Sequence, residues 1–266
     1  MRLKKPNRFA VVIITTYNIC MGIKYSVNED FFKNWSQEMA YVLGYIYADG
    51  SMTDASYLRG KYVSITSVER NNLAKIKNWL ESEHAITQRP PTTINGKDIY
   101  TLRIGSKEIY KDLIALGLYP NKSLSIGFPE IPSSYLPHFI RGYFDGDGCA
   151  YFEKSLGSKN QIISKRLRVI FTSGSKKFLS GLLDILRGDL DLNQSKVYNG
   201  HKSFQLSFST GDSIKIFKFL YAKAKESVFL ERKYETFLSY FSFMPNRVDI
   251  RVKNVIKYVG YGHVVK

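Results

Sequence analysis

Apolar and polar residues alternate in four stretches of the chain, which form two equivalent pairs. Residues 63–67 and 169–173 alternate apolar and polar side chains, and residues 100–104 and 204–208 do the same further along. A two-residue period of this kind is typical of a strand with one buried face. The pattern therefore predicts a matched set of half-buried strands in each part of the chain.

Helical patterns lie between and after these strands, again in equivalent positions. Apolar residues recur at helical spacing over 71–80 and 175–186, and over 107–116 and 212–221. With an apolar helix before each set, the order is helix, two strands, helix, two strands, helix, and it occurs twice. Because the matches keep one order, we interpret the chain as a duplicated unit. The predicted fold class is α+β, with two pseudo-symmetric αββαββα halves.

The helix that opens each unit is strongly apolar and ends in an acid. Residues 42–50 and 140–148 both finish with aspartate followed at once by glycine, at Asp49 and Asp147. The C-terminus of a helix carries about half a negative elementary charge, which disfavours a carboxylate there by about 0.3–1 kcal/mol. Two such acids in equivalent places indicate that a cation compensates them, whereas a single Asp-Gly pair would be an ordinary turn.

Residues at four-residue spacing line one face of each opening helix: Ala40, Gly44 and Ala48 in the first, and His138, Gly142 and Gly146 in the second. Glycine inside a helix costs about 0.5–1 kcal/mol relative to alanine, so its presence indicates that the two helices approach closely. We expect contact at Ala40, Gly44 and Gly142, which would bring the two aspartates together. Gly50 and Gly148 are expected to take the left-handed conformation that closes a helix.

The charge of the chain favours a polyanionic partner. Its 39 lysines and arginines outnumber 23 acidic residues, which gives a net charge of +16 and a pI near 9.6 over 266 residues. A basic excess of this size supports nucleic-acid binding through the release of counterions. A cationic surface that serves only solubility is the alternative interpretation.

The cysteines and the apolar segments bear on location. Cys20 and Cys149 are too far apart in the sequence to indicate a zinc site or a disulfide framework, so a reducing compartment is expected. The apolar stretch 9–14 is shorter than the roughly 20 residues that span a membrane. We therefore expect an intracellular protein, in a bacterial cytoplasm or an organelle matrix, that is neither secreted nor bound to a membrane.

The two opening helices resemble the signature of the LAGLIDADG homing endonucleases, in the form that carries both motifs in one chain. The resemblance covers about residues 26–241. The first copy departs at Tyr47, where the family pattern often has an acid, and the second copy keeps Asp145. The resemblance implies the homing endonuclease fold, with antiparallel saddle-shaped sheets around two central motif helices. It also implies a monomer without an obligate protein partner.

The same resemblance implies an intron-encoded, site-specific endonuclease. Such an enzyme binds a long asymmetric site in double-stranded DNA and hydrolyses phosphodiester bonds in both strands with divalent metal ions. Mg²⁺ is the expected cofactor, with Mn²⁺ as a substitute, because hard cations prefer oxygen ligands. An RNA maturase of the LAGLIDADG type, or a DNA-binding protein that has lost cleavage, is the alternative. Retention of both motif acids favours the enzyme, because a pure binder would gain from removing negative charge near phosphates.

Candidate site residues follow from the match to the motifs. The expected metal-binding positions are Asp49, Asp147, Ala48 and Gly146. The two aspartates are also expected to be catalytic, together with a lysine near each metal site that polarises the water network or neutralises phosphate charge. Lys122 and Lys233 resemble those lysines, and a generic phosphate contact is the alternative role for each.

One face of the predicted strands is polar and cationic and is expected to contact DNA. Hydrogen-bonding and cationic side chains suit base edges and phosphates in a major groove. An ordinary solvated sheet face is the alternative, although it does not explain the surplus of cations. The expected contact residues are Tyr62, Ser64, Thr66, Thr101 and Arg103 in the first half, and Arg166, Arg168, Thr172, Lys202, Gln205 and Ser207 in the second.

The repeat and a proline-rich segment divide the chain. Four prolines within one short segment exclude helix and central strand there, so we expect an extended linker. The tail has no counterpart in the first half, and the sequence gives no function for it. The expected parts are an N-terminal extension (1–25), the first half (26–118), the linker (119–137), the second half (138–242) and the C-terminal tail (243–266).

Overall fold

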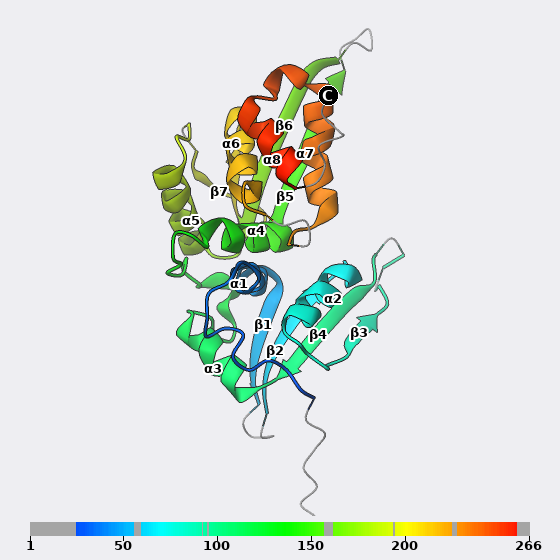
Figure 1. Ribbon diagram of the computed structural model, residues 1–266, viewed down its shortest axis with the longest axis vertical. Helices are drawn as coiled ribbons and strands as arrows, with labels where there is room; N and C mark the ends of the chain where they lie inside the picture. The colour runs from blue at the N-terminus through cyan, green and yellow to red at the C-terminus, as the bar shows by residue number, and fades with distance from the viewer. Residues whose placement is uncertain are drawn as a thin grey trace, which may run out of the picture.

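A computed structural model of the chain describes residues 25–55, 60–91, 93–94, 96–156, 162–193, 195–224 and 228–259. Two halves lie one above the other along the long axis of the molecule (Figure 1). Helices α1 (Gln37–Asp49) and α4 (Leu136–Asp147) meet at their junction. The N-terminal extension, apart from Tyr25, lies outside the described residues, and so does the loop at 157–161.

The first half continues from α1 through one four-stranded antiparallel sheet in the order β1-β2-β4-β3. Val63 and Ile65 of β2 are buried, as is Leu102 of β4, on the face that packs against helices. Alternation along each strand leaves the opposite face to polar side chains. The elements are β1 (Gly50–Ala55), β2 (Gly60–Ser67), α2 (Arg70–Trp79), β3 (Ile86–Arg89), β4 (Ile99–Gly105) and α3 (Lys107–Ala115).

The second half repeats this arrangement after α4, with the sheet order β5-β6-β8-β7. The two sheets therefore have the same topology, and the predicted αββαββα order is confirmed in both halves. The elements are β5 (Gly148–Leu156), β6 (Ile162–Ser173), α5 (Lys176–Asp189), β7 (Val197–Asn199), β8 (Phe204–Phe208) and α6 (Thr210–Tyr221).

The central helices touch backbone to backbone. A Cβ atom on Gly44 would lie 2.0 Å from the carbonyl oxygen of Phe139, and one on Gly142 would lie 2.0 Å from the carbonyl oxygen of Tyr41. The contact is thus reciprocal, as a pseudo-two-fold axis between the helices requires. Ala40, on the same face of α1, is fully buried. Only glycine permits this separation, which explains why two helices tolerate glycine in their interiors.

The expected left-handed caps at the ends of the motif helices are wrong. Gly50 has φ −94° and ψ 150°, and Gly148 has φ −87° and ψ 161°, so both are extended. Each helix passes directly into the first strand of its sheet, and the glycine is already a strand residue. Glycine is required here for steric reasons instead. A Cβ on Gly50 would lie 2.5 Å from the carbonyl oxygen of Ile46, and a Cβ on Gly148 would lie 2.5 Å from that of Phe144.

The proline-rich linker is less extended than expected. It contains a short 3-10 helix, η2 (Lys122–Leu124), and α4 already begins at Leu136. Pro137 lies in the first turn of α4, where the missing N–H would have no partner in any case. The prediction that proline excludes helix in this segment therefore fails at both ends.

Two helices follow the second αββαββα unit. α7 (Glu231–Phe243) packs against β5, and α8 (Ile250–Tyr258) packs on α6 after the short helix η3 (Pro245–Arg247). Asp249 caps α8 by accepting a hydrogen bond from the Val252 N–H at 2.7 Å. The tail is thus a structured addition to the second half, with the side chains of Val255 and Ile256 also buried.

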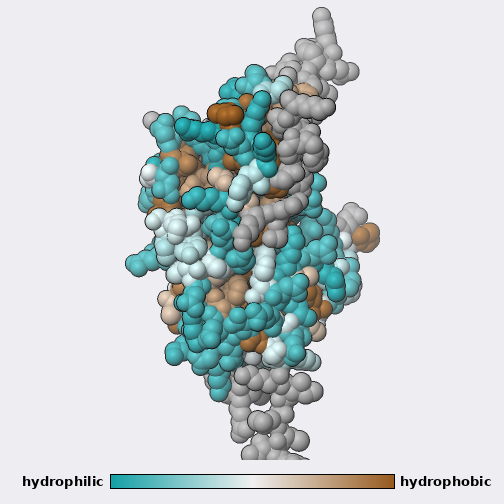
Figure 2. All heavy atoms as spheres, viewed as in Figure 1, coloured by the Kyte–Doolittle hydropathy of each residue, from teal (hydrophilic) through white to brown (hydrophobic). Residues whose placement is uncertain are grey.

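The core lies inside each half and along the contact of α1 with α4. The face of the molecule seen in Figure 2 is mostly hydrophilic, with small separate hydrophobic patches. Among the described helices, none combines the length and the apolar character needed to cross a membrane.

Candidate metal centre and nucleic-acid interface

Asp49 and Asp147 are the last residues of the two contacting helices. A Cβ on Gly146 would lie 2.4 Å from the Cβ of Ala48 and 3.3 Å from Oδ2 of Asp49, so the helix ends are close together. Within the described part of the chain, neither carboxylate accepts a hydrogen bond or joins an ion pair. The fold therefore gathers two acids at one point without supplying a protein partner for either.

Both carboxyl groups resist ionisation. Burial raises the pKa of Asp49 to about 6, and the nearby charge of Asp147 adds to the effect. Desolvation raises the pKa of Asp147 as well. Loss of water disfavours the charged form of a carboxyl group, and a second negative charge disfavours it further. A cation between the two groups would remove both penalties.

The donors at this point fit a hard divalent cation. The described residues contain no cluster of three or more His, Cys, Asp or Glu side chains, so a soft or all-protein metal site is not present among them. Two carboxylates with the adjoining backbone at Ala48 and Gly146 offer oxygen donors only. Mg²⁺ takes few protein carboxylates and keeps water or phosphate oxygens in its other positions. The site thus suits an ion that also binds DNA phosphates.

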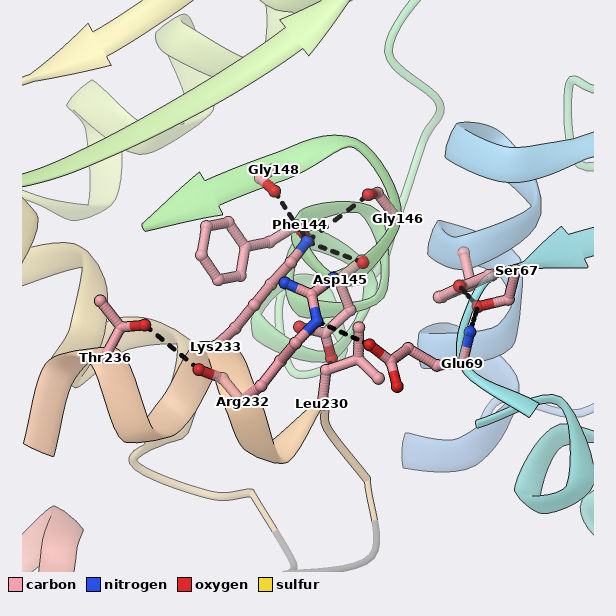
Figure 3. Close-up of polar contacts among 11 residues, drawn as sticks. Ser67, Glu69, Phe144, Asp145, Gly146, Gly148, Leu230, Arg232, Lys233 and Thr236 are labelled. Atoms are coloured by element: carbon pink, nitrogen blue, oxygen red, sulfur yellow. Dashed lines mark hydrogen bonds and ion pairs between the residues drawn. The ribbon is translucent and has the colours of Figure 1, made fainter. Parts of the chain in front are cut away.

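Lys122 and Lys233 are both buried, and both point into the C-terminal end of a motif helix. Nζ of Lys122 donates to the carbonyl oxygen of Tyr47 at 2.7 Å. Nζ of Lys233 donates to the carbonyl oxygens of Phe144 at 2.6 Å, of Asp145 at 2.7 Å and of Gly148 at 2.7 Å (Figure 3). An ammonium group there compensates the partial negative charge of the helix end.

The two lysines differ in their free donors. An ammonium group has three N–H bonds, and Lys233 uses all of them on backbone carbonyls. Lys122 has one acceptor among the described residues, so two of its N–H bonds remain for water or phosphate. Burial lowers the pKa of each lysine to about 8. The expected role in polarising water therefore fits Lys122, whereas Lys233 can act only through its charge.

Each acid is influenced most by the lysine whose amine is anchored on the other motif helix. The positive charge of Lys233 lowers the pKa of Asp49 more than the charge of Lys122 does. The reverse order holds for the pKa of Asp147, on which Lys122 acts more strongly. Each candidate reaction centre thus combines an acid from one motif helix with a lysine whose amine is anchored on the end of the other.

Asp145, the other acid of the second motif, has a structural role. Asp145 is fully buried and accepts hydrogen bonds from the Tyr41 hydroxyl at 2.9 Å and from the Leu230 N–H at 2.7 Å. It therefore ties α4 to α1 and to the start of α7. In the first motif, Tyr47 donates its hydroxyl to the carbonyl oxygen of Leu116 at 2.7 Å. Tyr47 and Asp145 occupy equivalent positions in the two motifs, and each forms hydrogen bonds that join its motif helix to another segment.

The expected contact residues of the first half share the open face of its sheet. The register pairs Ser64 with Arg103 and Thr66 with Thr101. The guanidinium carbon of Arg103 lies 4.0 Å from the ring centre of Tyr62, a cation–π contact that fixes the arginine over the strand. Oγ1 of Thr66 donates to the carbonyl oxygen of Asp49 at 3.2 Å, so this face begins at the acids.

The second half presents an equivalent face. Arg166, Arg168 and Thr172 alternate along β6 with buried residues, and Gln205 pairs with Thr172 across the sheet. Ser207 lies further along β8 on the same face. Lys202 is exposed in the turn between β7 and β8, where its φ of 55° is left-handed. All expected second-half residues therefore lie on one side of the sheet or at its rim.

The structure adds side chains that the sequence interpretation missed. They lie on strands whose sequences show no clear alternation of apolar and polar residues. One signal was available on β1, where the buried Met52 stands between polar neighbours, as it would in a half-buried strand. Their cross-strand partners place them on the open faces. These residues are Ser51 and Thr53 on β1, Cys149 and Tyr151 on β5, and Tyr198 on β7.

Asp49→Asn is expected to stabilise the metal-free protein above pH 7 and to leave it nearly unchanged near pH 4. Burial raises the pKa of Asp49 from 3.8 to about 6, so the folded state holds this proton more tightly than the unfolded state. The contribution of Asp49 to stability is full below about pH 4 and is lost as the pH rises through 6. Thermal unfolding in the presence of a chelator measures this effect, because each kcal/mol gained in the free energy of unfolding raises the Tm by about 2–4 °C.

Asp184→Asn is the matched control, because Asp184 is exposed on α5 and belongs to neither motif helix. An equal change for both variants at pH 8, or no change for Asp49→Asn, would contradict the assignment of Asp49 as a destabilised acid.

Comparison with known proteins agrees with this architecture. A family model described as a LAGLIDADG-like domain matches the chain twice, over residues 36–115 and 135–220. A search of curated proteins by sequence finds no match.

Several solved structures share the fold at low identity. The LAGLIDADG meganuclease I-AabMI bound to uncleaved DNA is 13% identical, with a TM-score of 0.53 over 85% of this chain and 98% of that chain. The meganuclease I-SmaMI bound to uncleaveable DNA is 14% identical, with a TM-score of 0.54 over 84% and 98%. The homing endonuclease I-LtrWI bound to target DNA is 14% identical, with a TM-score of 0.53 over 87% and 97%.

Proposed function

Because this chain belongs to the LAGLIDADG-like domain family, we propose that it is a monomeric, site-specific homing endonuclease. It binds a long asymmetric site in double-stranded DNA and hydrolyses phosphodiester bonds in both strands with divalent metal ions. The observation that carries this proposal is the meeting of Asp49 and Asp147, unpaired and desolvated, at the ends of two helices in backbone contact. A protein that only binds nucleic acid has no use for two such acids beside phosphates.

The metal would be held by the carboxylates of Asp49 and Asp147 and by backbone oxygens at Ala48 and Gly146. Mg²⁺ is the proposed ion, with Mn²⁺ as a substitute. When bound, a divalent ion lowers the pKa of its water and stabilises charge on the leaving oxygen of a phosphodiester. The backbone contact of the two motif helices at Gly44 and Gly142 would keep the two acids together beside the scissile phosphates.

The lysines supply positive charge where the phosphate gains negative charge. Lys122 has two free N–H donors and can bind the attacking water or a phosphate oxygen. Lys233 is fully committed to carbonyl oxygens and contributes through Coulomb attraction alone. Because burial lowers the pKa of Lys122 to about 8, its amine can release a proton more readily than a surface lysine. The two centres are therefore similar in charge but different in hydrogen bonding.

DNA would lie across the open faces of both sheets, which continue outward from the acids. A major groove about 12 Å wide admits a two-stranded ribbon, and polar side chains on the ribbon reach base edges there. The net charge of +16 supplies the phosphate attraction that such a long interface needs. Because the two faces carry different side chains, the two half-sites differ in sequence.

Cleavage selection tests the proposed function. The purified chain is incubated with a library of random DNA duplexes and Mg²⁺, and the ends of cleaved molecules are sequenced. The proposal requires one long asymmetric consensus with a break in each strand, and no recovery in a chelator. Enrichment of a bound sequence that is never cut would favour a DNA-binding protein without nuclease activity.

Arg168→Ala is expected to relax base preference at one or two positions of one half-site only. Arginine pairs bidentately with guanine, and a good contact contributes about 1–3 kcal/mol of discrimination. Arg168 aligns with Tyr62 of the first half, where the nearby Arg103 is already engaged with the tyrosine ring. A preference profile measured by selection for wild type and variant gives the result.

Arg251→Ala is the matched control, since Arg251 is exposed on α8 on the helical side of the second sheet. A profile unchanged by Arg168→Ala, or changed equally in both half-sites, would show that a different surface faces the DNA.

A further inference from the structure

Helix α7 begins with two adjacent cations that reach into different halves of the molecule. Nε of Arg232 donates to Oε1 of Glu69 in the first half at 2.8 Å. The next residue, Lys233, inserts its amine into the end of α4 in the second half. Figure 3 shows the two side chains leaving the helix in these directions. The start of α7 therefore joins the two halves beside the acids.

Glu69 is itself connected to the helix that carries Asp49. The Glu69 N–H donates to Oγ of Ser67 at 3.0 Å, and the Tyr45 hydroxyl donates to the same oxygen at 2.9 Å. Tyr45 lies one helical turn before Asp49 on α1. Hydrogen bonds and one ion pair thus form an unbroken path from α1, through Ser67 and Glu69, to the start of α7.

This path borders a pocket of about 210 Å³ between the halves. The first half contributes Asp49, Thr66 and Glu69 to its wall, and the second half contributes Gly146, Leu230 and Arg232. Asp49 itself lines this pocket, and the amine of Lys233 lies 3.5 Å from the carbonyl oxygen of Gly146 in the opposite wall. The Glu69–Arg232 pair is therefore part of the wall of one reaction centre.

At the centre of Asp147 and Lys122, the equivalent contact between the halves is a neutral hydrogen bond. Ser175 precedes α5 as Glu69 precedes α2, and both occupy the N-cap position. Oγ of Ser175 donates to the carbonyl oxygen of Ile126, just after η2, at 2.6 Å, and both atoms are buried. A Cβ on the preceding Gly174 would lie 2.6 Å from the carbonyl oxygen of Ser123, so the segment that carries Lys122 packs tightly on neutral backbone.

The Glu69–Arg232 ion pair and the Ser175–Ile126 hydrogen bond also differ in their exposure to solvent. The side chains of Arg232 and Glu69 are 54% and 34% exposed, so water and salt reach their ion pair. The Ser175 hydrogen bond is shielded from both. One lysine-bearing segment is thus held to the other half by a salt-sensitive charge pair, and its counterpart is held by a buried neutral contact.

We propose that the Glu69–Arg232 ion pair is a positioning contact that holds the start of α7, and with it Lys233, beside the end of α1 that carries Asp49, so that one of the two strand cleavages depends on it and the other does not. The inference rests on the proposed nuclease function. Neither Glu69 nor Arg232 touches the reacting atoms in this role. Breaking the pair lets the start of α7 move relative to α1, whereas the centre of Asp147 and Lys122 keeps its own anchor.

Strand-resolved cleavage tests this inference. Arg232→Gln and Glu69→Gln are assayed on the selected duplex, with a different label on each strand. Each variant is expected to slow cleavage of one and the same strand by roughly two- to fivefold, because a partly exposed ion pair contributes no more than this. The other strand keeps its rate, so nicked duplex accumulates. Raising the salt concentration weakens the same ion pair in the wild-type protein, so it is expected to slow cleavage of that same strand relative to the other.

The charge swap separates positioning from a direct DNA contact. Combining Glu69→Arg with Arg232→Glu is expected to move the ratio of strand rates back toward that of wild type, while Arg251→Gln and Glu235→Gln leave it unchanged. If Arg232 simply bound phosphate, Glu69→Gln would not slow cleavage and the swap would not rescue it, and either result overturns the inference. Equal slowing of both strands does so too. An unaltered protein that cuts neither strand would overturn the proposed function together with this inference.

Discussion

Asp49→Asn or Asp147→Asn is expected to abolish cleavage of DNA while leaving binding unchanged or tighter. Each substitution keeps the size of the side chain but removes a negative charge that would hold the metal. Loss of one electrostatic stabiliser at a reaction centre commonly lowers the rate by about 10²–10³-fold, and a lost metal ligand lowers it at least as much. Binding gains, because removing a carboxylate reduces repulsion toward phosphate oxygens.

Rates on labelled strands and equilibrium binding at one fixed salt concentration give the two quantities separately. Asp184→Asn on α5 is again the matched control and is expected to change neither. Full activity of either central variant, or a loss of binding large enough to explain the loss of rate, would contradict the role assigned to these two acids.

Gly44→Ala and Gly142→Ala are each expected to destabilise the protein by about 2–4 kcal/mol. Alanine favours the helix by about 0.5–1 kcal/mol over glycine, so propensity alone predicts a gain. The new Cβ would, however, lie 2.0 Å from a backbone carbonyl oxygen of the other motif helix, and backbone cannot move aside as a flexible side chain can. The steric term is the larger, and the helices must separate.

Gly188→Ala on α5 is the matched control, since the Cβ that it would add has no heavy atom within 4 Å apart from its chain neighbours and the adjacent backbone of its own helix. It is expected to be neutral or slightly stabilising, by up to about 1 kcal/mol. Chemical denaturation of the three variants measures the difference. A Gly44→Ala protein as stable as Gly188→Ala would mean that α1 and α4 are not in backbone contact in solution.

The repeat and its elements were predictable because they depend on local pattern. Strand alternation at 63–67 and 169–173 matches β2 and β6, and the buried positions are those that the period predicts. Ser36 is the N-cap of α1 and accepts from the Met39 N–H at 3.0 Å, as an oxygen-bearing residue before an apolar helix should. Duplication strengthens these signals, because each weak pattern occurs twice in the same order.

The contacts that shape the two centres depend on residues far apart in the chain. Lys233 reaches carbonyl oxygens more than 80 positions earlier, and Arg232 bonds a residue 163 positions earlier. No local pattern indicates which of many lysines will be buried at a helix end. The conformation of Gly50 was mispredicted for a related reason: a strand follows α1 immediately, and sheet pairing with Ile65 fixes its backbone.

Cleavage of each labelled strand of the selected duplex by the unaltered chain shows whether the protein is a metal-dependent endonuclease. With Mg²⁺, each strand is expected to be cut at one position, and a chelator is expected to stop both reactions without releasing the DNA. A protein that binds the same duplex specifically but cuts neither strand at any concentration of Mg²⁺ or Mn²⁺ would contradict this assignment.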